Sequence, residues 1–299
     1  MKKILFSFII KLFLLILFLI DKIFRFFRDK RFLTAIHDKI EEKQYYNLKI
    51  NKKKIKFFCP SSTTNSRVQS LFTKEPETLS WINNFENKGD EKIFFWDIGA
   101  NIGLYSIYAA TRFNNIEVIA FEPSTSNLRT LSRNISINNL HDKIKIFPVA
   151  LNDKENIFSI FSETQFKEGG SISNFKNNID YTGNVLEKNK IKNKYNIFGT
   201  NIDYLILNNI INIPNYIKID VDGIEHLIIE GGKKLLAKKE LKELSIEINN
   251  DYSAQQNLIT ELMKDNGFKK TSSTNAKFLN NVNYKRNFNE SLNTVYKRN

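Results

Sequence analysis

Short apolar runs alternate with amphipathic segments through most of the chain. Five runs are typical of buried strands because each is short and bounded by Gly, Pro or polar residues: 93–98, 117–122, 143–151, 216–221 and 244–248. Between them, residues 102–111, 124–135 and 224–237 repeat apolar side chains every three or four positions, as amphipathic helices do. Ser124 stands where it would cap the second helix. The alternation predicts an α/β fold with a mostly parallel sheet and helices on both faces.

Other segments fit this alternation less well. Residues 30–56 indicate a helix that leads into a short strand near 48–58. Pro148 lacks a backbone N–H, so the third strand should lie at a sheet edge or a bulge. Residues 152–200 are rich in Asn, Lys and Ser and are expected to be an insertion. Two further runs are expected to close the sheet as a terminal hairpin, 267–273 and 293–297.

The most apolar stretch covers residues 4–20 and is interrupted only by Ser7 and Lys11. As a helix it would be about 25 Å long, which is short of a bilayer core of about 30 Å. Polar residues form a stripe along one side, and this favours a helix in the membrane interface over one that crosses. If it does cross, basic residues at 22–31 would keep the rest of the chain in the cytoplasm. We therefore expect attachment at the cytoplasmic face of the inner (cell) membrane; the alternative is a buried helix of a soluble domain.

Composition and charge narrow the classes of protein. The chain has 299 residues, of which 41% are hydrophobic and 26% charged, and this balance excludes a wholly disordered or collagen-like protein. The single cysteine, Cys59, excludes an internal disulfide and makes a Cys-based metal centre implausible. Of the net charge of +13, residues 1–56 contribute +10 and residues 264–299 contribute +6, so the rest is slightly acidic. Because a phosphate-binding groove should lie on the folded body, nucleic acid is not an expected partner.

The candidate chemistry follows the first strand, in the sequence Asp97-Ile-Gly99-Ala-Asn101-Ile-Gly103. In open α/β sheets, ligands bind beyond the carboxyl ends of the strands. Gly99 permits a tight turn and close approach of a ligand, and Gly103 lets the next helix pack on the strand. Glu122 ends the second strand, where a carboxylate can accept both hydroxyls of a ribose. Together these features predict a nucleoside site; the alternative is an ordinary strand–turn–helix without a ligand.

The type of nucleoside follows from two residues. A dinucleotide fingerprint has a second glycine where this chain has Asn101. Asp97 would repel a diphosphate but suits an ammonium or sulfonium group. Both observations favour S-adenosylmethionine (SAM) as the cofactor over a nicotinamide dinucleotide.

The sequences WDIGANIGLYSIYAA, VIAFEPSTSNLRTLSRNISINN and YIKIDVDGIEHLIIEGG closely resemble the FkbM family of SAM-dependent methyltransferases. Residues 73–82 resemble the segment before the glycine loop in that family, and the likeness covers roughly residues 48–250. It implies the class I methyltransferase (Rossmann-like) sheet, with seven mostly parallel strands in the order 3-2-1-4-5-7-6. The likeness does not cover the apolar N-terminus and matches 152–200 only loosely. With the apolar run, it leads us to divide the chain into a membrane-associated helix (1–30), an extension with a short strand (31–72) and the methyltransferase domain (73–299), in which 152–200 is expected to be the acceptor-site insertion.

Methyl transfer requires alignment of the acceptor and removal of its hydroxyl proton. Asp220 ends the fourth strand and is the first candidate for the base or for a ligand of the acceptor hydroxyl. Glu225, Glu247 and His226 are further candidates. Helix neighbours point about 100° apart, so only one of Glu225 and His226 can readily face the site, and the family pattern favours Glu225. No metal site is assigned, although Asp220, Asp222 and Glu225 form an acidic cluster.

The resemblance also implies the cofactor contacts. The methionyl end is expected at Asp97 and at the backbone of Gly99, Ala100, Asn101 and Gly103. The ribose is expected at Glu122, and the adenine near Asn152. Glu75 and Glu77 are expected to help hold the amino-acid end.

The sequence thus predicts a membrane-attached SAM-dependent O-methyltransferase. The expected partner is a hydroxyl-bearing acceptor, such as a glycan, a lipid-linked saccharide or another secondary metabolite. Two alternatives stay open: an NAD(P)-dependent oxidoreductase or epimerase, and a catalytically silent membrane-tethered module with the same fold.

Overall fold

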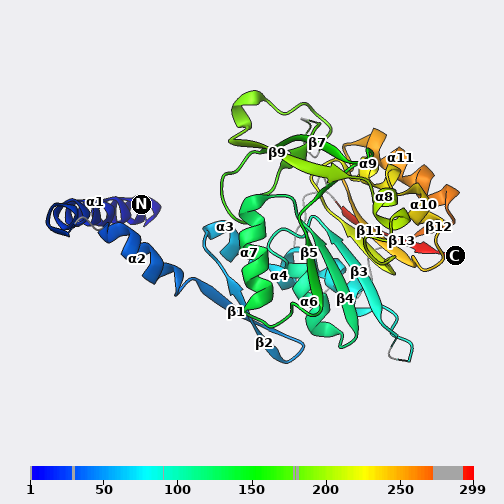
Figure 1. The fold of residues 1–299 in the computed structure, drawn as a ribbon, viewed down its shortest axis with the longest axis horizontal. Coiled ribbons are helices and arrows are strands. Elements are labelled where there is room, and N and C mark those ends of the chain that lie inside the picture. Colours follow the sequence, from blue (N-terminus) through cyan, green and yellow to red (C-terminus); the bar gives the residue numbers. More distant parts are fainter. Residues whose placement is uncertain (1, 29–30, 90, 178, 180–181, 272–291) are drawn as a thin grey trace. The chain divides into compact units, whose positions relative to one another are not determined.

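The computed structural model describes residues 2–28, 31–89, 91–177, 179, 182–271 and 292–299. The chain divides into two compact units, Met1–Tyr45 and Tyr46–Asn299. The first unit contains helices α1 (Lys2–Arg28) and α2 (Phe32–Glu41) (Figure 1). Among the described residues, one helical segment, Ile4–Phe26, is long and apolar enough to cross a membrane, a test that signal sequences and buried core helices also pass. Within this unit, Asp21 is buried, accepts a hydrogen bond from the Leu33 N–H at 2.9 Å and pairs with Arg25 at 3.2 Å.

The second unit is built on a seven-stranded sheet. Numbered along the chain, its strands follow the order 3-2-1-4-5-7-6. From one edge to the other they are β5 (Ile144–Phe147), β4 (Ile116–Phe121), β3 (Ile93–Ile98), β10 (Tyr216–Ile219), β11 (Glu243–Ile248), β13 (Leu292–Arg298) and β12 (Phe268–Thr271). β13 pairs antiparallel with both β11 and β12, and the other pairs in this sheet are parallel, so the predicted α/β class with a mostly parallel sheet is confirmed.

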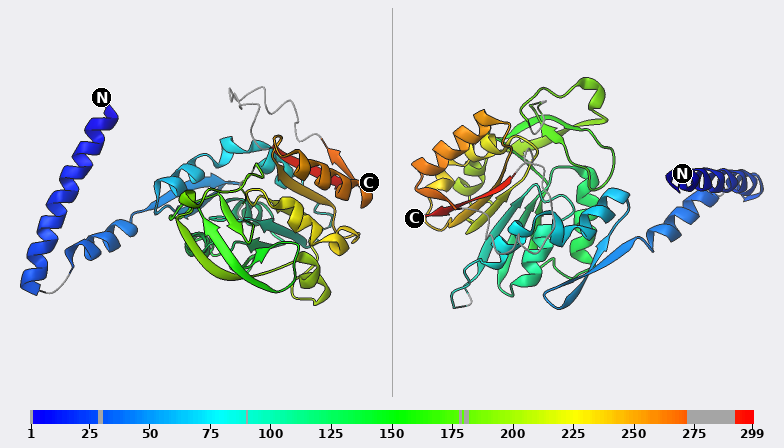
Figure 2. Two further views of the ribbon diagram at one scale, coloured as in Figure 1. Left: turned by 90° about the horizontal axis from the view of Figure 1, so that it is seen from above. Right: turned by 180° about the vertical axis from the view of Figure 1, so that it is seen from behind.

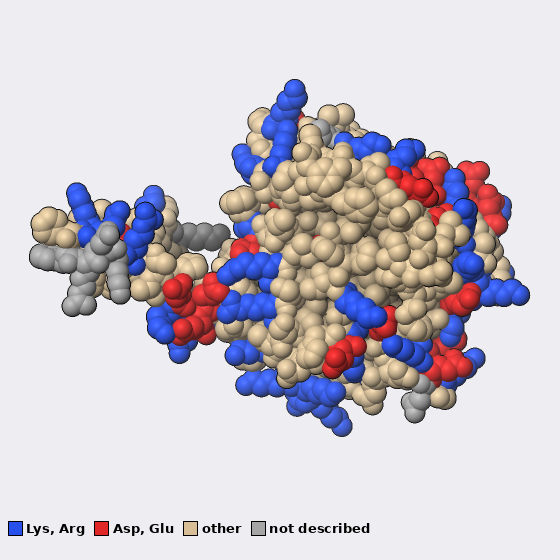
Figure 3. Space-filling model, viewed as in Figure 1, with Lys and Arg blue, Asp and Glu red and all other residues tan. Residues whose placement is uncertain are grey.

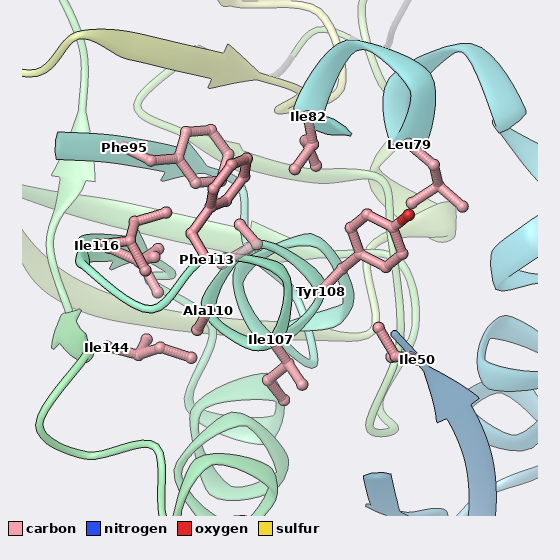
Figure 4. Packing of buried hydrophobic residues seen from close by; sticks show 14 of the residues in the cluster. Ile50, Leu79, Ile82, Phe95, Ile107, Tyr108, Ala110, Phe113, Ile116 and Ile144 are labelled. Atoms are coloured by element: carbon pink, nitrogen blue, oxygen red, sulfur yellow. The ribbon is translucent and has the colours of Figure 1, made fainter. Parts of the chain in front are cut away.

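Helices cover both faces of this sheet (Figure 2). One face packs against α5 (Pro76–Asn83), α6 (Leu104–Arg112) and α7 (Thr125–Ser136). The other packs against α8 (Ile202–Leu207), α9 (Glu225–Glu230), α10 (Lys233–Leu236) and α11 (Ser253–Asp265). Successive side chains of a strand enter opposite cores, because side chains alternate across a strand. Phe95 of β3 therefore packs in the first core with Ile107 of α6 (Figure 4), and Trp96 packs in the second.

Pro148 directly follows the edge strand β5. The predicted edge position of this strand is therefore confirmed, and it suits a residue that has no N–H to donate to a neighbouring strand. The prediction of one strand over 143–151 is wrong, because the chain changes sheets at this proline. Residues after it form β6 (Ala150–Leu151), which joins a second sheet with β7 (Ile157–Glu163), β8 (Ser173–Phe175) and β9 (Asn193–Thr200). The predicted insertion therefore has a sheet of its own, in the order β6-β9-β7-β8, and a short 3-10 helix, η1 (Lys188–Lys190).

Two other local predictions need correction. The single strand expected near 48–58 is a hairpin of β1 (Tyr45–Ile50) and β2 (Lys53–Phe58), because Asn51 and Lys52 both have positive φ, as a tight hairpin turn requires. The helix expected over 224–237 is broken at Gly231, where a Cβ would lie 2.3 Å from the Asn152 carbonyl oxygen. The hairpin leads to α3 (Ser62–Gln69) and α4 (Leu71–Lys74).

Candidate active site

The glycine loop after β3 is held against the end of β10. Gly99 has φ of 83°, and a Cβ there would lie 1.9 Å from the Asp220 carbonyl oxygen. The close approach predicted at Gly99 is thus made to another strand of the protein. Gly103 has φ of 85° and precedes α6; a Cβ there would lie 2.5 Å from Leu131 Cδ1. Only glycine fits both positions, so the loop passes close to two neighbouring elements.

Glu122 ties the end of β4 to this loop. Its Oε2 accepts a hydrogen bond from the Asn101 N–H at 2.7 Å, and its Oε1 accepts one from the Ser124 N–H at 2.9 Å. The Ser124 hydroxyl caps α7, as predicted, by accepting from the Asn127 N–H. Glu122 is 4% exposed, and burial raises its pKa to about 7.

A cavity with mostly apolar walls opens beside Glu122. Gly99, Asn101, Glu122 and Asn127 line its polar side. The remaining wall consists mainly of apolar side chains from β3, β4, the β5–β6 segment, the insertion and α9, among them Ile98, Phe121, Val149, Leu151, Phe161, Phe175 and Ile228. We call this the apolar cavity. A pocket with an apolar wall and carboxylates at one side suits a flat heterocycle that carries hydroxyl groups.

A second cavity lies on the other side of the same loop, and we call it the acidic cavity. It is lined by Glu75, Asp220, Asp222 and Glu247, together with Lys74, Tyr105, Lys218 and Arg67. Gly99, Asn101, Asp220 and Asp222 line both cavities. The two cavities therefore meet at the carboxyl ends of β3 and β10, where ligands bind in open α/β sheets.

The charges of the acidic cavity are arranged around Lys218. Its side chain is 1% exposed, and its Nζ lies 2.5 Å from Asp220 Oδ2 and 4.8 Å from the centroid of the Tyr105 ring. Burial alone would raise the pKa of Asp220, but the Lys218 charge and hydrogen bonds outweigh burial and hold that pKa below its ordinary range. The Asp220 charge, burial and a hydrogen bond to Asp220 raise the pKa of Glu247 well above its ordinary value. Asp220 is thus the ionised member of this pair and Glu247 the protonated one.

The insertion reaches the site through its 168–173 segment. The Gly170 carbonyl accepts a hydrogen bond from Asn101 Nδ2 at 2.8 Å, and the Gly169 N–H donates to Asn127 Oδ1 at 2.9 Å. The Ile172 N–H donates to Asp222 Oδ2 at 2.7 Å. Burial raises the pKa of Asp222 to about 6, and the Asp220 charge adds to the effect. These bonds fix the insertion to both loops that form the cavities.

Several residues predicted for the site lie behind it. Asp97 is 1% exposed and lines neither cavity; its Oδ2 accepts a hydrogen bond from the Ser106 hydroxyl at 2.6 Å, and burial raises its pKa. Glu225 is also buried, and it accepts hydrogen bonds from the Val221 and Gly223 N–H groups and from Gln255 Nε2. Burial raises the pKa of Glu225 to about 7. Glu225 therefore supports the loop after β10 from the side away from the cavities.

Of the other residues predicted for the site, one lines a cavity and three do not. Ala100 lines the acidic cavity beside Gly99. Asn152 is fully buried and accepts a hydrogen bond from the Lys154 N–H at 2.7 Å. His226 packs edge-on against Tyr252, and Glu77 lies in the first turn of α5. Asn152, His226 and Glu77 line neither cavity, and their contacts with a cofactor or acceptor stay predictions.

Sequence reasoning missed the cationic residues of the acidic cavity. Lys218 carried a signal, because it is a charged residue between two isoleucines in a run that otherwise fits a buried strand. Arg67 and Lys74 gave none, since they come from polar segments in which basic residues are usually solvated.

Comparisons with known proteins agree with this geometry. The family described as "Methyltransferase FkbM domain" matches residues 97–270. The methyltransferase sdnD of Sordaria araneosa is 36% identical over 58 residues, which is 19% of this chain and 22% of that protein. The AMB antimetabolite synthetase AmbE of Pseudomonas aeruginosa is 39% identical over 59 residues, which is 20% of this chain and 3% of that protein. The chain thus matches less than a quarter of the length of either curated relative.

Two solved structures illustrate the likeness of the chain to known folds. A crystal structure of methyltransferase FkbM from Methylobacillus flagellatus is 16% identical and has a TM-score of 0.41; the likeness covers 79% of this chain and 53% of that one. A SAM-dependent methyltransferase from Agrobacterium tumefaciens is 10% identical and has a TM-score of 0.47, with 86% of this chain and 71% of that one covered.

Proposed function

Because this chain belongs to the FkbM methyltransferase family, we propose that it transfers a methyl group from SAM to a hydroxyl group of a glycan, a lipid-linked saccharide or another secondary metabolite. The observation that carries the proposal is the pair of cavities that share Gly99, Asn101, Asp220 and Asp222. One cavity has the character of a nucleoside pocket, and the other has carboxylates suited to a hydroxyl group. Membership of a methyltransferase family disfavours the oxidoreductase alternative.

The residues of the apolar cavity fit the adenosyl part of SAM. A carboxylate has about four acceptor positions. On Glu122, the backbone N–H groups of Asn101 and Ser124 use two of them, and Asn127 Nδ2 lies at 3.5 Å from Oε1 as a weaker third donor. The remaining position is available to a ribose hydroxyl at the cavity wall. Beneath the loop, Asp97 Oδ1 is buried without a hydrogen-bond partner among the described residues, and the Lys218 charge acts on this carboxyl group. SAM supplies an electrophilic methyl group on a sulfonium.

In the acidic cavity, this chain's own residues would bind and deprotonate the acceptor. Ionised Asp220 accepts a hydrogen bond from the acceptor hydroxyl and so orients its oxygen. Lys218 keeps Asp220 ionised, and Glu247 shares a proton with it. Because such a pair titrates as a unit, we assign Asp220 and Glu247 together as the group that takes the hydroxyl proton.

Calorimetric titration with SAM tests the proposal. Wild-type protein should bind SAM, and Glu122→Ala should bind it about 10- to 100-fold more weakly, since a hydrogen bond to a charged group contributes about 1.5–3 kcal/mol. Glu91→Ala, at an exposed position away from both cavities, is the control and should bind as wild type does. Wild-type protein that does not bind SAM would overturn the proposal. SAM binding without methyl transfer to any fraction of a cell extract would favour the catalytically silent module instead.

The membrane attachment belongs to the same proposal. Helix α1 exposes large apolar side chains along Ile4–Phe26. Within the first 17 residues of this segment, 4–20, Lys11 is the only ionisable residue. An exposed apolar helix of this kind is stable when lipid covers it. Figure 3 shows one face of the second unit, with a broad uncharged centre and with Lys, Arg and acidic residues at its margin.

A further inference from the structure

A third recess adjoins the acidic cavity. It is lined by residues of α3, of α4 and of the junction between them: Ser62, Thr63, Ser66, Arg67, Ser70 and Lys74. Arg67, Ser70 and Lys74 also line the acidic cavity. The lining of the recess contains two cations and four hydroxyl groups but no acidic residue. We call it the basic recess.

The polarity of the recess follows from the sequence of α3. Ser62 and Ser66 are four residues apart, so they lie on one face of the helix, and Ser70 follows directly after its last residue. Thr64 and Val68 occupy the opposite face and are buried. Within the described part of the chain, the hydroxyls of Ser62 and Ser66 make no recorded hydrogen bond and are free to bind a ligand.

Arg67 is held in place and keeps unused donors. Its Nε donates to the Gly169 carbonyl oxygen at 2.6 Å, which anchors the side chain to the insertion. A guanidinium has five N–H donors, and among the described residues no carboxylate forms a salt bridge with this one. Lys74 pairs with Glu75 at 3.1 Å, but about half of its side chain is exposed. Both cations are therefore available at the junction of the two hollows.

We propose that the methyl acceptor carries an anionic group, a phosphate or a carboxylate, that binds in the basic recess while its reacting hydroxyl lies at Asp220 and Glu247. This inference rests on the proposed function and specifies its substrate class. The carboxylates of the acidic cavity repel an anion but accept a neutral hydroxyl, whereas the recess offers only cations and hydroxyls. Arginine is suited to this recognition because its planar fork of N–H donors matches the oxygens of a phosphate or a carboxylate.

The test uses full-length protein in detergent, methyl-labelled SAM and an extract of the cells that produce the protein. The extract is separated by anion exchange before the labelling reaction. Label should enter material from the retained, anionic fractions. Prior phosphatase treatment abolishes labelling if the group is a phosphate, and amidation with a carbodiimide abolishes it if the group is a carboxylate.

Variants connect this result to the recess. Arg67→Gln and Lys74→Gln should each lower labelling of the anionic fraction at least about tenfold at limiting extract, the loss expected for one charged hydrogen bond. Lys74→Arg should restore most of it, because the charge is retained. All variants should bind SAM within about twofold of wild type, and Lys234→Gln, an exposed residue of α10 that lines none of the three hollows, should label as wild type does.

The outcomes separate this inference from the proposed function. Label in the unretained, neutral fraction overturns the anionic acceptor while leaving methyl transfer intact. Labelling of the anionic fraction that Arg67→Gln and Lys74→Gln leave unchanged also overturns it. Absence of label from every fraction with wild-type protein counts against methyl transfer itself, and the inference falls with it.

Discussion

Lys218 of the central strand β10 forms an ion pair with Asp220, the residue that follows this strand, with Nζ 2.5 Å from Oδ2. The lysine side chain is almost completely buried, and its charge also acts on Glu75 and Asp97. Burial would lower the pKa of Lys218, but these three carboxylates raise it above the ordinary range. One buried cation thus balances several buried anions, and the charge of the proposed active site depends on it.

Replacement of this cation should destabilise the fold. Lys218→Met leaves the buried Glu75 and Asp97 and the partly exposed Asp220 without their shared cation. Breaking a fully buried pair costs about 3–5 kcal/mol, and the cost here should lie at or below the lower end of that range because water reaches Asp220. Urea unfolding measures the change. Lys269→Met, at an exposed position of β12 in the same sheet, should change the free energy of unfolding by less than about 0.5 kcal/mol. Equal unfolding midpoints for the two variants would contradict the prediction.

The glycine loop offers a matched pair of substitutions. Gly99 and Gly267 have nearly the same φ, 83° and 78°, but a Cβ at Gly267 would meet no atom within 4 Å. Both alanine variants incur backbone strain of about 1–2 kcal/mol. Gly99→Ala must also displace the Asp220 backbone, so it should cost about 1–3 kcal/mol more and weaken SAM binding. The prediction fails if chemical denaturation and calorimetry do not distinguish the two variants.

The buried Glu225 should make stability depend on pH. Its pKa rises from the ordinary value of 4.5 to about 7 in the folded protein, with burial as the main cause. The folded state therefore binds the proton more tightly, and this stabilisation is complete below pH 4.5 and lost as the pH rises through 7. Between these values the free energy of unfolding should fall by up to about 1.4 kcal/mol per pH unit because of this group.

Glu225→Gln removes this titration, so its free energy of unfolding should fall less between pH 5 and 8 than that of wild type. Urea unfolding at several pH values measures both profiles. Glu91→Gln, at an exposed position, serves as the control and should follow wild type. Parallel profiles for wild type and Glu225→Gln would show that Glu225 is ionised throughout.

The proposed proton-accepting pair, Asp220 and Glu247, can be tested by substitution of each residue. Glu247→Gln and Asp220→Asn should lower methyl transfer about 10²- to 10⁴-fold, the usual contribution of general base catalysis. SAM binding should persist in Glu247→Gln, because Glu247 lines the acidic cavity and not the apolar cavity that is assigned to the adenosyl group. Glu243→Gln lies on the same strand, β11, but hydrogen-bonds Trp81 Nε1 at 2.9 Å outside the cavities, and it should retain activity. Single-turnover assays with labelled SAM distinguish these outcomes.

The N-terminal helix should determine fractionation. Full-length protein should sediment with membranes, and a chain that starts at residue 31 should stay in the supernatant and still bind SAM. Resistance to an alkaline carbonate wash indicates a spanning helix, whereas release indicates one that lies in the interface. Recovery of the full-length protein in the soluble fraction would overturn the attachment.

Local sequence determined the elements that depend on local chemistry. The strands that carry the site, the Ser124 cap and the edge position of Pro148 follow from hydrophobic periodicity, from capping and from the missing proline N–H. These properties involve residues only a few positions apart, so one sequence is enough to reveal them. The motifs around Gly99, Glu122 and Asp220 indicated the family for the same reason.

Contacts between distant segments were decided only by the tertiary structure. Arg67 hydrogen-bonds the carbonyl oxygen of Gly169, which is 102 residues away in the sequence. The apolar run over 143–151, predicted as one strand, contributes to two different sheets. The sequence also did not reveal which charged side chains line a cavity. Glu225 and Asp97 hydrogen-bond within the protein behind the loops, whereas Lys218 lines the acidic cavity. The spacing of apolar and polar residues along the sequence indicates which face of its own helix or strand a side chain occupies. The partners of that side chain depend on the elements that pack against that face.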